Sequence, residues 1–186
     1  DRERLEALAR LLVSLSFDAN ADEDENVIAT FLQQSLAEAA SPRQVMDVLF
    51  EGHVSSQITD ERALLLISGL ADQGSYPARA LMRDEALAAR IIDTAGFDLD
   101  EMLARLDALV TSTIEQSTEG DRDAVSEALR LFKRRESLAL YALEVAGERS
   151  VRETTRGIAH LAICVTRAAL AHAARFHKRE DLLEHI

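Results

Sequence analysis

The chain has 186 residues, of which 47% are hydrophobic and 4% are aromatic. This hydrophobic content supports a packed core built from aliphatic side chains and excludes a disordered chain. The single cysteine, Cys164, excludes a scaffold held together by internal disulfide bonds. The net charge of −12 argues against general nucleic-acid binding, which requires a basic surface.

The sequence shows no sign of a membrane span or of a signal peptide. No stretch approaches the roughly 18 uncharged apolar residues of a membrane span, and the N-terminus lacks the basic-then-apolar pattern of a signal peptide. We therefore expect a cytoplasmic protein with no membrane partner. Because the sequence begins at Asp1 rather than Met, we expect a segment excised from a longer protein.

The charge is unevenly distributed along the chain. Residues 130–178 hold ten Lys/Arg and four Asp/Glu, a balance of +6, so the remainder carries −18. One interpretation is attraction within the fold between a basic block and an acidic body. The other is a docking face for an acidic partner.

The N-terminal part predicts two helices. Leucines at helical spacing indicate a first helix over about residues 2–15, and apolar residues indicate a second over about 27–36. The acidic run 22–25 lies where the second helix begins, and negative charge there suits the helix dipole. A calcium-binding loop is a poor alternative because the alternating ligands and the central glycine are missing.

Short helices follow. Ser41 and Pro42 predict an N-cap and a first-turn proline for a helix ending near Gly52. Thr59 or Asp60 caps a helix over about 63–71, whose Leu64–Ile67 run is apolar on nearly all sides and is expected to be buried centrally. Two further short helices are predicted over about 78–82 and 85–95, after a turn at 74–77.

Three long helices complete the pattern. Asp98 with Glu101, and Ser150 with Glu153, are capping boxes that open the first and the third of them. The first is expected to reach about residue 116, the second to run over about 121–146, and the third to run over about 150–176. The inward residues predicted for the second are Val125, Leu129, Phe132, Leu140 and Leu143, and those for the third are Val151, Ile158, Leu161, Val165 and Ala169.

The predicted fold is therefore all-α, because no segment shows the alternation typical of strands. We expect a cluster of short helices over 1–96, a bundle of three long antiparallel helices over 97–178, and a tail over 179–186.

Candidate catalytic and metal-binding residues do not converge. Gly74-Ser75 and Asp98-Leu99-Asp100 superficially match a nucleotidyltransferase signature, but their separation is too long and Asp98 is better explained as a cap. His160 and Cys164 lie four apart on one predicted helix face, yet two ligands do not make a zinc site. We expect no catalytic, cofactor-binding or metal-binding residue in this chain.

Glu136 lies on the apolar stripe of the second long helix, between Phe132 and Leu140. A buried carboxylate must be paired or protonated. We expect an ion pair with Arg152, Arg156 or Arg167 on the next helix; the alternatives are an interdomain contact and, third, catalysis by this carboxylate.

One stretch resembles a known family. Residues 130–136, Arg-Leu-Phe-Lys-Arg-Arg-Glu, followed by a glycine-containing break and the helix 151–162, are similar to the helical region of bacterial glutamine-synthetase adenylyltransferases (the glutamate–ammonia-ligase adenylyltransferase/deadenylylase family). Residues 65–92 also look similar, and the resemblance covers about 63–174. The family's Gly-Gly and Asp-x-Asp catalytic core is expected after the last helix, beyond this chain, so its catalytic residues match no position here.

The resemblance implies a non-catalytic helical domain. It would support AMP transfer to or from glutamine synthetase by an adjacent nucleotidyltransferase domain, and only that domain would use ATP and magnesium. Residues expected to face the neighbouring domain or partner are Arg130, Lys133, Arg134, Arg135, Glu136, Arg152 and Arg156. The alternative is a free-standing α-helical interaction module that binds an acidic partner through the basic face of its last two helices.

Overall fold

The computed structural model describes residues 32, 34–93, 101, 102, 104–106, 108, 109, 112 and 122–177. Regular structure among these residues is helical, with no strand, so the all-α prediction is confirmed for the described part of the chain. The predicted helix over 2–15, the start of the helix over 27–36, the cap at Asp98 and the tail over 179–186 lie outside the described residues.

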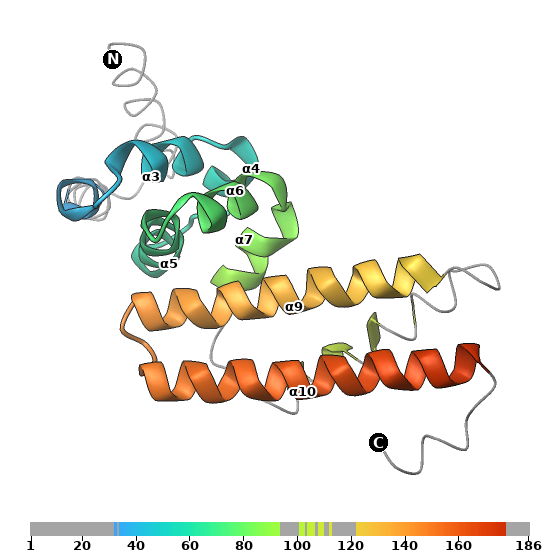
Figure 1. Cartoon of the computed structure of the whole chain (residues 1–186). Coiled ribbons are helices and arrows are strands. Elements are labelled where there is room, and N and C mark those ends of the chain that lie inside the picture. Colours follow the sequence, from blue (N-terminus) through green and yellow to red (C-terminus); the bar gives the residue numbers. More distant parts are fainter. Residues whose placement is uncertain are drawn as a thin grey trace. The chain divides into compact units, whose positions relative to one another are not determined.

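Short helices precede two long ones along the described chain (Figure 1). The short helices are α3 (Pro42–Leu49), α4 (Gly52–Ser55), α5 (Glu61–Asp72), α6 (Ser75–Arg83) and α7 (Glu85–Ile92). The long helices are α9 (Arg122–Val145) and α10 (Val151–Phe176). Residues 34–38 are also helical, as are the described residues between 101 and 112.

By its internal contacts the chain divides into two compact units. The first comprises Asp1–Thr94 and Tyr141–Arg149, and the second comprises Ala95–Leu140 and Ser150–Ile186. The boundary between the two units therefore falls within α9. The boundary predicted from the sequence, between residues 96 and 97, would instead leave the whole of α9 in one unit.

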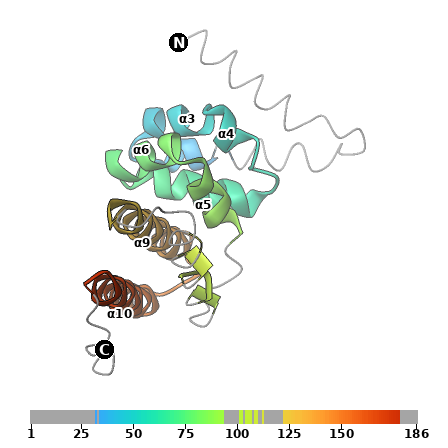
Figure 2. The same ribbon diagram turned by 90° about the vertical axis from the view of Figure 1, so that its right-hand side faces the viewer.

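The core of the first unit is built around α5, which contacts α3, α6 and α7. Leu64, Leu66, Ile67 and Leu70 of α5 are each at most 1% exposed. The central burial predicted for this leucine-rich run is therefore confirmed, with Leu65 only half-buried. Figure 2 shows these short helices gathered into one cluster.

The starts of the short helices follow local hydrogen bonds. Asp60 is the N-cap of α5, because its Oδ1 accepts from the Ala63 N–H at 2.7 Å. At α3 the proline is in the first turn as predicted, but Ser41 makes no side-chain cap bond. The carboxylate of Asp72 instead accepts the Ser41 N–H at 2.7 Å. A helix end was predicted near Gly52, but α4 begins there. A helix of one turn is too short to show a periodic pattern in the sequence, so it was not predicted.

The second unit contains residues 122–140 of α9 and the whole of α10. These two helices run antiparallel and side by side (Figures 1 and 2). Its core cluster consists of Leu106, Val125 and Leu129, with Phe132, Cys164, Val165 and Ala168 packed against them. The two helices approach closely at Gly157, where an added Cβ would lie 3.1 Å from Leu140 Cδ1. A glycine at this position allows that approach.

The inward face of α10 differs from the prediction. Leu161 is fully buried and Val165 half-buried, as expected, but Val151, Ile158 and Ala169 are exposed. The buried face is rotated, because Thr154 and Gly157 take the buried positions toward the start of the helix. Small residues there permit close packing, and the larger apolar side chains are left on the outside.

The turn between α9 and α10 is fixed by backbone bonds. Gly147 has φ of 75°, and the Glu148 and Arg149 N–H groups donate to the Leu143 carbonyl at 2.9 and 3.1 Å. Glycine adopts this left-handed conformation without a steric penalty.

The predicted capping box that opens α10 is also present. The Glu153 carboxylate accepts the Ser150 N–H at 2.9 Å, and the Glu153 N–H donates to the Ser150 hydroxyl at 3.3 Å. This part of the prediction is confirmed.

Candidate functional site

Most of the large exposed apolar side chains of the described chain lie on the outer side of α10. A continuous row at helical spacing is free of charge: Val151, Thr155, Ile158, Ala162, Thr166, Ala169, Ala173 and Phe176. We call these eight residues the apolar row. Beside it, Ile163 and Leu170 are 52% and 48% exposed. Monomeric proteins rarely leave a contiguous apolar surface uncovered, so such a surface marks a contact site.

Helix α10 is also long and apolar enough to cross a membrane by length and composition alone, over Val151–Ala174. Only 17% of its most apolar stretch is buried. The sequence analysis had not predicted a stretch of this length and apolar composition. Its other side packs against α9 in the core cluster.

Three arginines border the apolar row. Arg152, Arg156 and Arg167 are exposed and share one side of α10 with Ile163 and Leu170, at spacings of three, four and seven. We call these five residues the arginine row. Among the described residues, the ion pairs found do not include any of these three arginines. Attraction within the described fold therefore does not account for them.

The basic residues predicted on α9 differ in exposure. Arg130 and Lys133 are exposed, whereas Arg134 and Arg135 are half-buried. Arg130 pairs with Glu127 on its own helix at 3.4 Å, and both side chains lie in solvent. Such a pair contributes little stability.

Glu136 is buried in the second unit and forms an ion pair, as predicted. Its described partner is Arg105, with 3.1 Å between Nη2 and Oε2, rather than a residue of α10. Arg105 also pairs with Glu101 at 2.6 Å. The side chain of Glu136 is 3% exposed, so it is not presented on the surface to a partner.

The candidate metal ligands His160 and Cys164 both lie on α10. Among the described residues, no group of three His, Cys, Asp or Glu side chains is placed to hold a metal. His160 and Cys164 are half-buried. Gly74 and Ser75 form the start of α6, and Asp98 and Asp100 lie outside the described residues.

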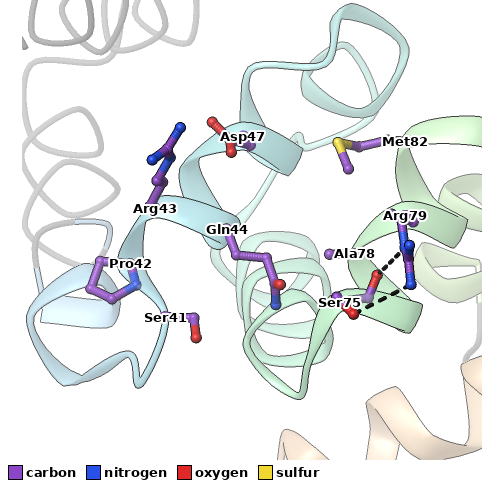
Figure 3. A pocket seen from close by; sticks show the side chains of 9 residues that line it. All are labelled: Ser41, Pro42, Arg43, Gln44, Asp47, Ser75, Ala78, Arg79 and Met82. Carbon is purple, nitrogen blue, oxygen red and sulfur yellow. Dashed lines mark hydrogen bonds between the residues drawn. The ribbon is translucent and has the colours of Figure 1, made fainter.

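A cavity of about 440 Å³ in the first unit lies between α3 and α6. Figure 3 shows its lining: Ser41, Pro42, Arg43, Gln44, Asp47, Ser75, Ala78, Arg79 and Met82. Arg79 is held on its own helix, since its Nε donates to the Ser75 carbonyl at 3.0 Å. The lining contains both arginine and aspartate, so it does not select ligands of one charge.

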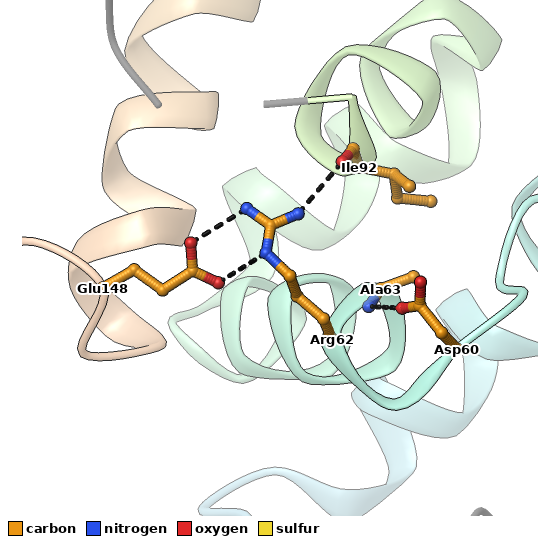
Figure 4. Close-up of polar contacts among 5 residues, drawn as sticks. All are labelled: Asp60, Arg62, Ala63, Ile92 and Glu148. Carbon is orange, nitrogen blue, oxygen red and sulfur yellow. Dashed lines mark hydrogen bonds and ion pairs between the residues drawn. The ribbon is translucent and has the colours of Figure 1, made fainter. Parts of the chain in front are cut away.

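Arg62 links three parts of the first unit (Figure 4). Its guanidinium forms a two-point contact with Glu148, at 2.8 Å for each bond, and donates to the Ile92 carbonyl at 3.1 Å. Parallel bonds of this kind fix geometry as well as adding stability. This cluster ties α5 to the end of α7 and to the segment after α9, which indicates a structural role.

A second cavity of about 400 Å³ lies in the second unit, between the first turns of α9 and the last turns of α10. Four members of the apolar row line it: Thr166, Ala169, Ala173 and Phe176. His172 lines it as well, and its Nε2 is buried without a hydrogen-bond partner among the described residues. The sequence carries no motif at His172, Ile163, Leu170 or Phe176 that predicts this site.

Comparisons with known proteins were made against family models, curated proteins and solved structures. None of the three gave a significant match to this chain.

Proposed function

We propose that this chain is an α-helical interaction module that binds an acidic amphipathic segment of a protein partner along the outer side of α10. The observation that carries the proposal is the pairing of an uncovered apolar row with three exposed arginines on one helix. An amphipathic helix lays apolar side chains at i, i+3, i+4 and i+7 on such a surface. Acidic residues on its flanks would meet Arg152, Arg156 and Arg167.

Electrostatics favour this partner. The segment 130–178 has a positive balance within a chain of net charge −12, so an acidic partner is attracted locally. Complementary charge of this kind mainly raises the association rate and rejects wrong partners. The apolar contacts supply most of the affinity.

The proposal is tested with a synthetic helical peptide that has leucine at i, i+3, i+4 and i+7 and glutamate on both flanks. We expect binding that weakens as salt rises. Replacing the glutamates by lysines is expected to abolish it. Anionic lipid vesicles and sedimentation of the free chain test a membrane surface and a second copy as the occupant.

Two pairs of substitutions locate the surface. Arg156→Glu with Arg167→Glu is expected to weaken peptide binding at least about tenfold. The matched control, Arg79→Glu with Arg83→Glu, reverses two exposed arginines of α6 and is expected to leave binding unchanged. Equal binding by the glutamate and lysine peptides, or by all variants, contradicts the proposal.

A more specific form follows from the family resemblance. In it, the partner is an adjacent nucleotidyltransferase domain together with glutamine synthetase, and this chain is the helical accessory domain that positions them in a cytoplasmic protein. The residues at 130–136 and 151–162 support it. Sequencing the gene beyond Ile186 is the test: a strand and turn carrying Gly-Gly and Asp-x-Asp would favour it, and their absence would exclude it.

The bundle itself forms part of the proposal. We propose that the segment 97–116 supplies a third long helix beside α9 and α10. Helical structure at the described residues between 101 and 112, with Met102 and Leu106 buried, supports this arrangement.

A further inference from the structure

The outer surface of α10 carries its arginines along one flank of the apolar row. Each residue of the arginine row directly follows a residue of the apolar row in the sequence, as Arg152 follows Val151 and Arg167 follows Thr166. Successive residues of a helix are turned by about 100°, so the whole arginine row lies on the same side of the apolar row.

The opposite flank of the apolar row packs against α9. Residues that directly precede members of the row are buried at Thr154, Gly157 and Leu161. An added Cβ at Gly157 would lie 3.1 Å from Leu140 Cδ1 of α9. A bound helix therefore meets the arginine row along one of its own flanks only, and the position of the charges on that flank depends on the direction of the helix.

The direction of a bound helix decides which of its flanks meets the arginine row. When two helices lie side by side in opposite directions, equivalent flanks face each other, whereas in the same direction opposite flanks do. An antiparallel partner therefore meets the arginine row with acidic residues that directly follow its own apolar residues. In a parallel partner, the acidic residues would directly precede the apolar ones.

The distribution of charge along α10 favours the antiparallel direction. Arg152 and Arg156 lie in the first two turns, near the positive end of the helix dipole, and of the arginine row only Arg167 lies in the second half of the helix. Glu153 lies in the same first turns, but its carboxylate accepts the Ser150 N–H and hydroxyl at 2.9 and 2.6 Å. The negative C-terminal end of a partner helix is therefore attracted to the start of α10.

We propose that the partner segment is a helix that binds antiparallel to α10 and has its acidic residues directly after its apolar residues in sequence. The inference rests on the proposed function for the surface, to which it adds the direction and the sequence pattern of the partner. The α10 of a second copy does not fit this pattern, because antiparallel pairing would bring one arginine row against the other.

Two peptides of identical composition test the direction. Each is a helix of the length of α10, held by a hydrocarbon staple on its outward side, with leucines every three or four residues. In the first peptide each glutamate directly follows a leucine, and the second peptide has the reversed sequence. We expect the first to bind about three- to tenfold more tightly. Equal affinity, or tighter binding of the reversed peptide, would overturn the proposal.

A spin label reads the direction independently of affinity. A nitroxide at the N-terminus of the first peptide is expected to broaden the NMR signals of Ala173 and Phe176, at the end of α10. Broadening at Val151 and Thr155 instead would show parallel binding and contradict the proposal.

Charge reversal provides the matched variants. In Arg156→Glu with Arg167→Glu, the preference for the first peptide is expected to disappear, and a version of that peptide with lysine in place of glutamate is expected to bind more tightly than to the unaltered chain. Arg79→Glu with Arg83→Glu, on α6, is expected to keep the preference. An unchanged preference in the α10 variant would count against the proposal.

The peptide of the proposed function has glutamate on both flanks, so it suits either direction. If that peptide binds and the two new peptides bind equally, the antiparallel inference alone fails. If none of the three peptides binds, the proposed function fails as well.

Discussion

Arg105 and Glu136 form an ion pair inside the second unit across 31 residues of sequence, with 3.1 Å between Nη2 and Oε2. The two ends differ in environment, since the Arg105 side chain is 31% exposed and that of Glu136 is 3% exposed. A carboxylate this deeply buried depends on its cation and hydrogen bonds, because no water replaces them. The pair therefore fixes the segment around Arg105 against α9.

Glu136→Ala is expected to destabilise the fold by about 1–3 kcal/mol. The loss comes from leaving the guanidinium of Arg105 partly buried without this carboxylate, together with the space left on the apolar stripe. Urea unfolding of the variant and of the unaltered chain measures the difference. An unchanged midpoint would show that the pair has no structural role.

Two control variants separate burial from charge. Glu127→Ala removes an exposed carboxylate that pairs with Arg130, and its effect is expected to stay within about 0.5 kcal/mol. The double variant Arg105→Met with Glu136→Leu replaces both charges by apolar groups and is expected to recover most of the stability lost in Glu136→Ala. A double variant less stable than Glu136→Ala would contradict this reasoning.

Gly147 provides a prediction on backbone conformation. An added Cβ would have no neighbour within 4 Å, so a substitution there is penalised only by its φ of 75°. Gly147→Ala is expected to destabilise by about 1–2 kcal/mol. Gly147→Asn is expected to cost less, because asparagine tolerates the left-handed region. Thermal unfolding of the two variants gives this order; equal losses would point to a steric cause.

Local signals in the sequence predicted most of the helices in the described chain. Pro42, Asp60 and the Ser150–Glu153 box mark helix starts that the structure confirms, because each depends on hydrogen bonds or dihedral angles within a few residues. The four-residue helix α4 was missed, since one turn has no measurable period.

The side-chain arrangement of the second unit was harder to predict. Helix α10 has apolar or small residues on most sides, so periodicity alone did not show that Thr154 and Gly157 face inward and Ile158 outward. The prediction of the ion-pair partner of Glu136 was wrong for a related reason. Arg105 is distant in sequence and belongs to no pattern that includes Glu136. The candidate site on α10 depends on that rotation, and the sequence did not identify it.

The sequence left open whether Thr59 or Asp60 is the N-cap of α5, and the structure identifies Asp60. Asp60 accepts from the Ala63 N–H, so Asp60→Ala is expected to destabilise the first unit by about 1 kcal/mol. The neighbouring Thr59→Ala changes an exposed residue and is expected to have an effect below about 0.5 kcal/mol. Urea unfolding compares them; a larger loss in Thr59→Ala would assign the cap to the wrong residue.

The contact between Gly157 and Leu140 tests how closely α9 and α10 pack. An added Cβ at residue 157 would lie 3.1 and 3.2 Å from the two methyl carbons of Leu140. In Gly157→Ala, the gain in helix propensity of about 1 kcal/mol opposes this mild crowding, so we expect a net change within about 1 kcal/mol. Gly157→Leu also gains helix propensity, but its longer side chain collides with Leu140, and a net destabilisation of about 1–3 kcal/mol is expected.

Ala159→Leu makes a similar enlargement on the exposed side of α10 and is expected to change stability by less than about 0.5 kcal/mol. Thermal unfolding of the three variants gives the comparison. Helix propensity favours Gly157→Leu and only slightly disfavours Ala159→Leu, because alanine is the strongest helix former and glycine one of the weakest. A loss confined to Gly157→Leu therefore reports the packing of α10 on α9. Equal stability of the two leucine variants would mean that the buried face of α10 is not the one containing Gly157.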